Sequence, residues 1–153
     1  YAFASHFAPE QLLDAMSTYR ELFKPSDKLS KPYSAFVMNV VAADTDDEAA
    51  HLFTTLQQNV IRMRRNTRGQ LPPPIANLDD FCEPHEKTTA AHALRCSAVG
   101  SLQTVRKEMQ YWLDQTGANE IIITGQIYDH QARLRSFEIA AEAAKGLRFS
   151  SQA

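Results

Sequence analysis

The fold is decided by the stretch Val99–Ala144, which has the sequence VGSLQTVRKEMQYWLDQTGANEIIITGQIYDHQARLRSFEIAAEAA. Its first part predicts a helix over Leu102–Thr116, because apolar residues recur there at helical spacing. Ser101 is a good N-cap for this helix, and Gly117 is the expected left-handed stop. Glu120–Gly125 follows as a continuous apolar run rich in β-branched residues, which predicts a strand buried on both faces.

A last helix is predicted after this strand, because Asp129 can cap it and four apolar residues share one face: Leu134, Phe137, Ala141 and Ala144. Helices that alternate with apolar strands indicate parallel βα units. In parallel sheets, functional residues gather at the carboxyl ends of the strands. Two candidate sites follow, one at Gly100 and Ser101 and the other at Tyr128, Asp129 and His130.

The sequence before this stretch continues the same alternation of strands and helices. Apolar and aromatic runs predict strands at Tyr1–Phe7, Tyr33–Ala43 and Ser97–Val99. Pro9 is a good first helical residue for a helix over 9–23. Thr45 and Glu48 form a capping box that starts a helix ending near Arg65. The chain is therefore predicted to be an α/β protein with four β-plus-helix units.

Residues 68–96 interrupt this rhythm. Three consecutive prolines at 72–74 exclude a helix or a central strand there, and only Glu83–Arg95 supports a further helix. Long insertions in compact α/β domains are commonly lids or binding loops. We therefore expect a single domain over 1–153 with a mobile, lid-like insertion at 68–96.

Composition bounds the class of protein. The chain has 153 residues and a formal net charge of −2, so its charge gives no case for nucleic acid or an anionic membrane as partner. No run approaches the ~18 apolar residues of a membrane span. Cys82 and Cys96 lack CxxC spacing, and free thiols in a reducing cytoplasm are the expected state. The chain opens at Tyr1 directly in a predicted strand, from which we expect that part of a longer protein precedes it.

Histidine and hydroxyl side chains give the candidate polar groups. His6 and His130 each fall where a strand meets its following helix, and each is either a group lining a shared mouth or a polar loop residue. Ser101 is either a helix cap alone or part of an anion site at a helix N-terminus. Asp129 is a better cap than catalytic acid, and no pair of histidines has metal-ligand spacing, so no metal is expected.

Two further features stand out along the chain. Asn39 is the single polar residue inside an otherwise apolar predicted strand. Four arginines, at 62, 64, 65 and 68, cluster where the preceding helix ends. Cations at the negative end of a helix are the ordinary explanation, and a phosphate-binding cluster is the alternative.

Longer phrases resemble one family. The N-terminal ones are Ala2-Phe-Ala-Ser-His-Phe-Ala-Pro9, Pro25-Ser-Asp-Lys-Leu-Ser-Lys-Pro-Tyr33 and Ala42-Ala-Asp-Thr-Asp-Asp-Glu-Ala49. The C-terminal ones are Val99-Gly-Ser101, Thr116-Gly-Ala-Asn-Glu-Ile-Ile-Ile-Thr124 and Ile127-Tyr-Asp-His-Gln-Ala-Arg-Leu-Arg-Ser-Phe-Glu138. In this order, from Tyr1 to about Lys145, the chain is similar to the bacterial-luciferase-like flavin monooxygenases.

The resemblance implies a fold and a cofactor. Members of the family form an FMN-binding (β/α)8 barrel of roughly twice this length. The chain would then be the C-terminal half of the barrel, strands five to eight, with the insertion where the family carries a mobile loop. Ala4, Ser5 and His6 would lie near the isoalloxazine ring, with Gly100 and Ser101 as further cofactor-binding candidates. The substrate pocket would include Tyr128, Asp129 and His130.

The resemblance also implies what lies elsewhere. The first four strands, the histidine usually assigned to catalysis and much of the flavin-phosphate site belong upstream of Tyr1, so no catalytic residue is assigned here. The implied activity is oxidation of a small organic substrate, an aldehyde being one candidate, by reduced flavin and O2. The alternative is a flavin-binding or association module without turnover. A homodimer, or the N-terminal half of the parent, is the expected partner.

Overall fold

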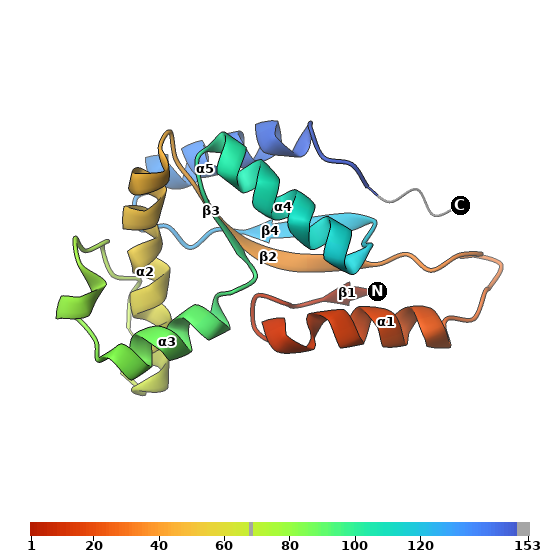
Figure 1. Cartoon of the computed structure of the whole chain (residues 1–153), viewed down its shortest axis with the longest axis horizontal. Coiled ribbons are helices and arrows are strands. Elements are labelled where there is room, and N and C mark those ends of the chain that lie inside the picture. The colour runs from red at the N-terminus through yellow and green to blue at the C-terminus, as the bar shows by residue number, and fades with distance from the viewer. Residues whose placement is uncertain (68, 150–153) are drawn as a thin grey trace.

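Figure 1 shows the computed structural model, which describes residues 1–67 and 69–149. Strands and helices alternate as the sequence predicts. The strands are β1 (Ala2–Phe3), β2 (Ala35–Ala42), β3 (Ser97–Gly100) and β4 (Glu120–Thr124). The helices are α1 (Leu12–Leu22), α2 (Asp46–Arg64), α3 (Pro84–Ala93), α4 (Leu102–Thr116) and α5 (His130–Ala144), with short 3-10 turns at Pro9–Gln11 and Leu78–Asp80.

All four strands pair in parallel, but their order is not the order of the chain. The central strand is β2. Its Phe36 lies opposite Phe3 of β1 and also opposite Ile121 of β4, so these two strands flank it on opposite sides. Asn39 lies opposite both Ser97 of β3 and Thr124 of β4, which places β3 on the same side as β1. The expectation of four strands paired consecutively is therefore wrong, because β4 skips β3 and pairs with β2.

The first strand is shorter than expected. Only Ala2 and Phe3 are in β1, because the chain turns directly afterwards: the amides of Ser5 and Phe7 donate to the carbonyls of Phe3 and Ala4, each at 2.9 Å. This turn ends the ladder to β2 and sets His6 at the strand's carboxyl end.

One face of the sheet is covered by α1, α4 and α5. Side chains from these helices and from alternate residues of β2 form the main core: Leu12, Met16, Phe36, Met38, Val40, Val105, Met109, Leu113 and Ile139. The predicted buried face of α5 is wrong. Leu134 is 44% exposed and Phe137 is 36% exposed, whereas Ser136 and Ile139 are buried. The Ser136 hydroxyl accepts a hydrogen bond from the amide of Ala42 at 2.9 Å, which fixes this rotation of the helix against β2.

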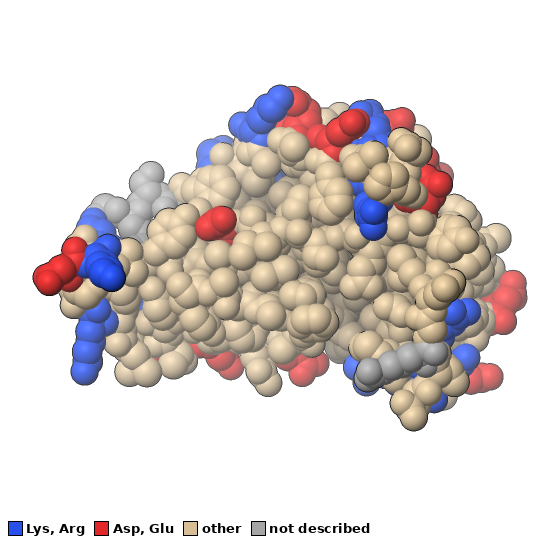
Figure 2. Space-filling model, turned by 180° about the vertical axis from the view of Figure 1, so that it is seen from behind, with Lys and Arg blue, Asp and Glu red and all other residues tan. Residues whose placement is uncertain are grey.

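The opposite face of the sheet is covered only toward the carboxyl ends of the strands, where Ala49 and Leu52 of α2 pack on Val41. Ile122 of β4 is 41% exposed, so the prediction of a strand buried on both faces is wrong. Figure 2 shows the molecule from behind, with charged side chains mostly along the margins and few in the middle. Away from α2 this face is apolar and partly exposed, and we call this part, around Val37 and Ile122, the uncovered face.

The segment over residues 69–96 is built onto α2. Its prolines serve as hydrogen-bond acceptors: the Thr55 hydroxyl donates to the carbonyl of Pro72 at 3.1 Å and the Gln58 amide to that of Pro73 at 2.9 Å. A second apolar cluster joins the segment to the helix: Leu56, Val60, Ile61, Leu78, Ala90 and Leu94. Residue 68, the first of the predicted insertion and the last of the arginine cluster, lies outside the described residues.

An ion pair also holds this segment against the end of α2. The Arg65 guanidinium donates to both carboxylate oxygens of Glu86, at 2.7 and 2.5 Å, and lies over the ring of Phe81. These hydrogen bonds lower the pKa of Glu86 to about 2. Arg65 thus lies at the end of α2, where cations are expected, and also has a structural partner there. The lid function itself stays a prediction.

Candidate functional site

A cavity of about 300 Å³ opens at the carboxyl ends of β1 and β4. Its walls come from five parts of the chain: the turn after β1, the middle of β2, α2, the end of α3, and the loop after β4. The residues that line it are His6, Phe7, Asn39, Leu56, Asn59, Val60, Met63, Arg64, Ala93, Leu94 and Gln126. Functional sites of parallel α/β sheets form at this end of the strands.

His6 is held in the wall of this cavity by the turn that ends β1. Its neighbour Ser5 is fully buried, and the Ser5 hydroxyl donates to the carbonyl of Val37 in β2. The Nδ1 atom of His6 is buried without a hydrogen-bond partner among the described residues. Burial lowers the pKa of His6 below its ordinary value of 6.5, because the protonated ring is less well solvated there. The lowered pKa favours the neutral imidazole.

Three side-chain amides complete the polar part of the cavity. Asn39 is 2% exposed, and its Nδ2 donates to the Ser97 hydroxyl at 3.4 Å. The Nδ2 atom of Asn59 in α2 donates to Oε1 of Gln126 at 3.2 Å, joining the helix to the loop after β4. The carbonyl of Asn59 and the amino group of Gln126 remain available. Together with His6, these amides offer neutral donors and acceptors, and the Arg64 guanidinium adds one cation to the lining.

The imidazole of His6 is expected to titrate below 6.5. The unfolded chain then binds this proton more readily than the folded chain, so the free energy of unfolding falls as the pH falls through about 6.5. A pH titration of the ring C–H signals measures the pKa, and the variant His6→Gln should lose this part of the pH dependence. A His6 pKa at or above 6.5 would contradict the burial of its ring.

Gly100 and Ser101 lie elsewhere, where α4 begins beside α2. The amide of Ser101 donates to Oδ1 of Asp46 at 2.6 Å, and the Thr104 hydroxyl donates to Oδ2 at 3.1 Å. These hydrogen bonds hold the pKa of Asp46 below its ordinary range. Ser101 occupies the N-cap position but its side chain makes no capping bond, so the expected cap is replaced by the Asp46 carboxylate. The anion at the N-terminus of α4 is therefore the carboxylate of Asp46, a residue of the chain itself.

The approach of Asp46 depends on Gly100. This residue has a φ of +149°, and a Cβ there would lie 2.7 Å from Asp46 Oδ1 and 2.6 Å from the Thr104 side chain. Glycine is therefore favoured at position 100 because it lets the start of α2 contact the start of α4. Cofactor binding by Gly100 and Ser101 stays a prediction, and the structure does not bring them to the His6 cavity.

Tyr128, Asp129 and His130 lie beyond the cavity as well. Asp129 caps α5 as predicted, accepting from the amide of Ala132 at 2.7 Å. His130 contacts Arg133, with 2.9 Å between Nδ1 and Nη2, and Tyr128 is 56% exposed. Of this predicted group, none lines the His6 cavity, and Gln126 takes that place. Their role in a substrate pocket stays a prediction.

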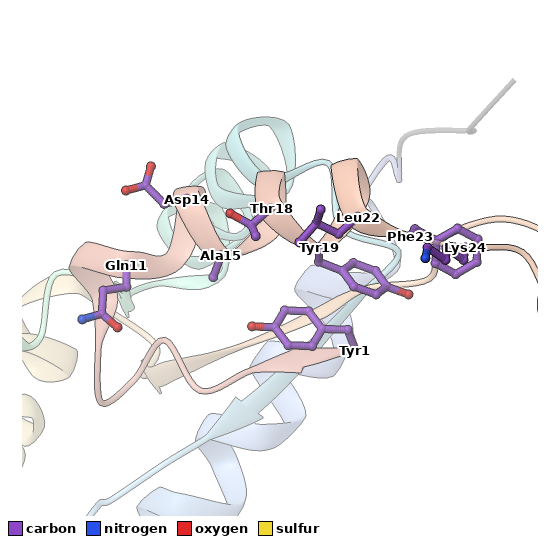
Figure 3. Close-up of a pocket in the computed structure, with 9 residues that line it drawn as sticks. All are labelled: Tyr1, Gln11, Asp14, Ala15, Thr18, Tyr19, Leu22, Phe23 and Lys24. Atoms are coloured by element: carbon purple, nitrogen blue, oxygen red, sulfur yellow. The ribbon is translucent and has the colours of Figure 1, made fainter.

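A larger cavity, of about 650 Å³, lies at the opposite end of the sheet. Figure 3 shows it between Tyr1, at the start of the chain, and one side of α1. The Tyr1 and Tyr19 rings stack there with centroids 4.9 Å apart. It lies at the amino end of β1, away from the strand ends where such sheets place their sites, so it is not the candidate site.

The described residues contain neither a metal-binding cluster nor a candidate membrane-spanning helix. Over residues 1–67 and 69–149, no three His, Cys, Asp or Glu side chains are grouped to hold a metal ion. In the same part of the chain, no helix is long and apolar enough to cross a membrane. Cys82 and Cys96 are free thiols, as predicted, and burial raises the pKa of Cys96 to about 11.

The chain is similar to known proteins along almost all of its length. It is 48% identical over 147 residues to a protein of Escherichia coli K12 named luciferase-like monooxygenase, and 36% identical over 145 residues to YvbT, an uncharacterised protein of Bacillus subtilis. These matches cover 96% and 95% of the chain, which spans only 44% and 43% of the length of these two relatives. No protein-family model matches the sequence.

Solved structures give the same assignment. The crystal structure of apo-MsnO8 superposes with a TM-score of 0.84 at 31% identity, covering 95% of this chain and 44% of that protein. The monooxygenase RslO1 from Streptomyces bottropensis superposes with a TM-score of 0.53 at 18% identity, covering 93% and 40%, a likeness that shows the fold alone. Over the part that it covers, the chain belongs to the luciferase-like monooxygenase family.

Proposed function

We propose that this chain forms the C-terminal part of an FMN-dependent monooxygenase that oxidises a small organic substrate with reduced flavin and O2. The support is its membership of the luciferase-like family together with one observation of its own. That observation is the buried Nδ1 of His6, which lacks a partner among the described residues and lies at the carboxyl end of a parallel strand. A buried polar atom without a partner is costly unless a ligand supplies one.

The donor set of the cavity fits a flavin ring. The planar ring system presents carbonyl and N–H groups along its edge, and these match a neutral imidazole and side-chain amides. His6, Asn39 and Gln126 are the residues proposed to hold it. When bound, FMN supplies the redox chemistry, and the protein supplies position and surroundings.

The protein's contribution follows from the residues around the ring position. A neutral His6 accepts or donates one hydrogen bond without placing a charge in the cavity. Leu56, Val60 and Leu94 give apolar walls from α2 and α3. Such walls exclude water and strengthen the hydrogen bonds inside. The segment over residues 69–96 is proposed to act as the cover of this cavity, because Ala93 and Leu94 belong both to its end and to the lining.

The uncovered face of the sheet supports a barrel as the complete architecture. Parallel strands with helices on one face and an apolar opposite face are the layers of a (β/α)8 barrel, although the pairing of β4 with β2 departs from the consecutive strand order of such a barrel. We propose that further strands complete the barrel in the longer relatives, so that Val37 and Ile122 face its interior. In the chain by itself, a second copy is the proposed partner. A cytoplasmic location is proposed from the free thiols and the flavin chemistry.

The decisive experiment uses the full-length protein that contains this chain. Reduced FMN is mixed with O2, and flavin reoxidation is followed with and without an aldehyde. Monooxygenase function requires a substrate-dependent change in the reoxidation course and an oxidised product. Flavin binding with no such change would instead support a binding module without turnover, and absence of flavin binding would refute both.

The isolated chain is expected to bind FMN only weakly, with a dissociation constant above 1 μM. The reason is that small-ligand sites enclose most of the ligand surface, whereas the chain spans 44% of its relatives. Calorimetric titration of FMN into the 153-residue chain tests this expectation. Sub-micromolar affinity would show that the chain carries a complete flavin site.

A further inference from the structure

The cavity around His6 continues into a second one of about 560 Å³, because Phe7, Arg64 and Ala93 line both. The two cavities differ in character. The inner one has carbon-rich walls from α2, whereas the outer one is lined largely by polar side chains: Glu10, Gln11, Thr89 and His92. The result is one groove, apolar at the His6 end and polar at the outer end, with Arg64 at the junction.

Among the described residues, Arg64 is the arginine whose side chain lines both parts of the groove. Its neighbours in the cluster are engaged elsewhere: Arg65 pairs with Glu86, and Arg62 lies over the ring of Phe81. Within residues 1–67 and 69–149, Arg64 has no carboxylate within ion-pair distance. Arg65 has a side-chain partner in addition to its place at the helix end, whereas Arg64 has only its place at the helix end.

The only described carboxylate in the groove is Glu10, and it lies on the outer wall. It also lines a separate cavity together with Arg95, and His6 is not part of that lining. Arg64, by contrast, stands beside the apolar chamber, and His92 adds a second basic group on the outer side. The charge nearest to the inner chamber is therefore positive.

We propose that Arg64 recognises the anionic head of a small amphipathic substrate whose apolar body lies along the α2 side of the inner chamber, opposite the sheet-side residues proposed to hold the flavin ring. The inference rests on the proposed function, since it assigns a substrate class to the same site. Leu56, Val60 and Met63 contact the apolar body, and the Arg64 guanidinium donates to a carboxylate at the junction. His92 lies on the outer side of that carboxylate.

A matched pair of probes tests this assignment on the 153-residue chain. Octanoate and 1-octanol share a hydrocarbon chain and differ in the head, and binding of each is followed through the ring signals of His6. We expect octanoate to bind more tightly than octanol. The variant Arg64→Gln should weaken octanoate about fivefold, the size expected for an exposed ion pair, and leave octanol unchanged.

The control is Arg62→Gln, which removes the same charge from the same helix outside the groove. Arg62→Gln should leave the affinity for octanoate unchanged. If both variants lower this affinity equally, the net positive charge of the region and not a contact with Arg64 is responsible, and the proposal is overturned. Equal binding of the two probes, or no binding of either, would also overturn it. The two proposals can fail separately. If the full-length protein does not bind flavin but the chain still binds octanoate more tightly than octanol, the proposed function is refuted and the anion site at Arg64 is retained.

Discussion

Replacement of Phe36 by Ala is expected to lower the free energy of unfolding by about 3–5 kcal/mol, the usual cost of removing a buried aromatic side chain. Phe36 is fully buried in the central strand, where it packs against residues of α1 and α4. Because a domain of this size is stable by only about 5–15 kcal/mol, the variant should be close to unfolding. Urea denaturation followed by circular dichroism measures the change.

The same strand offers a size-matched test of which face is covered. Val40 is 1% exposed within the main core, whereas Val37 is partly exposed on the opposite face of β2. Val40→Ala should cost about 2 kcal/mol, and Val37→Ala less than about 1 kcal/mol. Equal costs would show that the second face is also packed, and the description of an uncovered face would then be wrong.

Local signals in the sequence predict local structure well here. The helix over Leu102–Thr116 is found with these bounds, and Gly117 adopts the expected left-handed φ of 56°. Asp129 and Thr45 both accept capping bonds from backbone amides, as predicted. Each of these features depends on residues at most five positions apart. The chain therefore carries the information for them within the element itself.

Features that depend on distant neighbours are predicted less well. The buried face of α5 is set by the Ser136 contact with β2, which no spacing within the helix reveals. Isoleucine is typical of buried strands, but whether Ile122 is buried depends on what covers the sheet. The pairing of β4 with β2 likewise depends on packing, because β3 is short and lies beside the other edge of β2.

Some residues of the candidate site can be predicted from the sequence, and others cannot. His6 and Asn39 could be singled out because each is a polar residue at the end of, or inside, an apolar run. Asn59 and Gln126 carry no such signal, since amides on a helix surface and in a loop are ordinary. They become part of the site only because α2 crosses the carboxyl end of the sheet and brings them within 3.2 Å.

The chain is expected to form a homodimer at micromolar concentration through the uncovered face and the free edge of β4. Residues 120–124 pair with β2 on one side only, so their outward backbone groups are available to another strand. Ile122 places an apolar side chain beside them on the open face, and covering such surface contributes about 25 cal/mol per Å². The opposite edge offers less, because β1 has two residues and shares that edge with β3. A two-fold pairing of β4 edges closes on itself and needs no filament.

The variant Ile122→Lys tests this arrangement by placing a charge on the free edge, as natural edge strands do to block pairing. Sedimentation equilibrium should give twice the chain mass of 17.2 kDa for the unmodified protein and the single mass for the variant. Leu13→Lys is the matched control, because Leu13 is 45% exposed, close to the 41% of Ile122, and lies on α1 at the covered face. This control should remain dimeric. A well-folded monomer for the unmodified chain would refute the dimer, and a dimer that survives Ile122→Lys would show that association uses another surface.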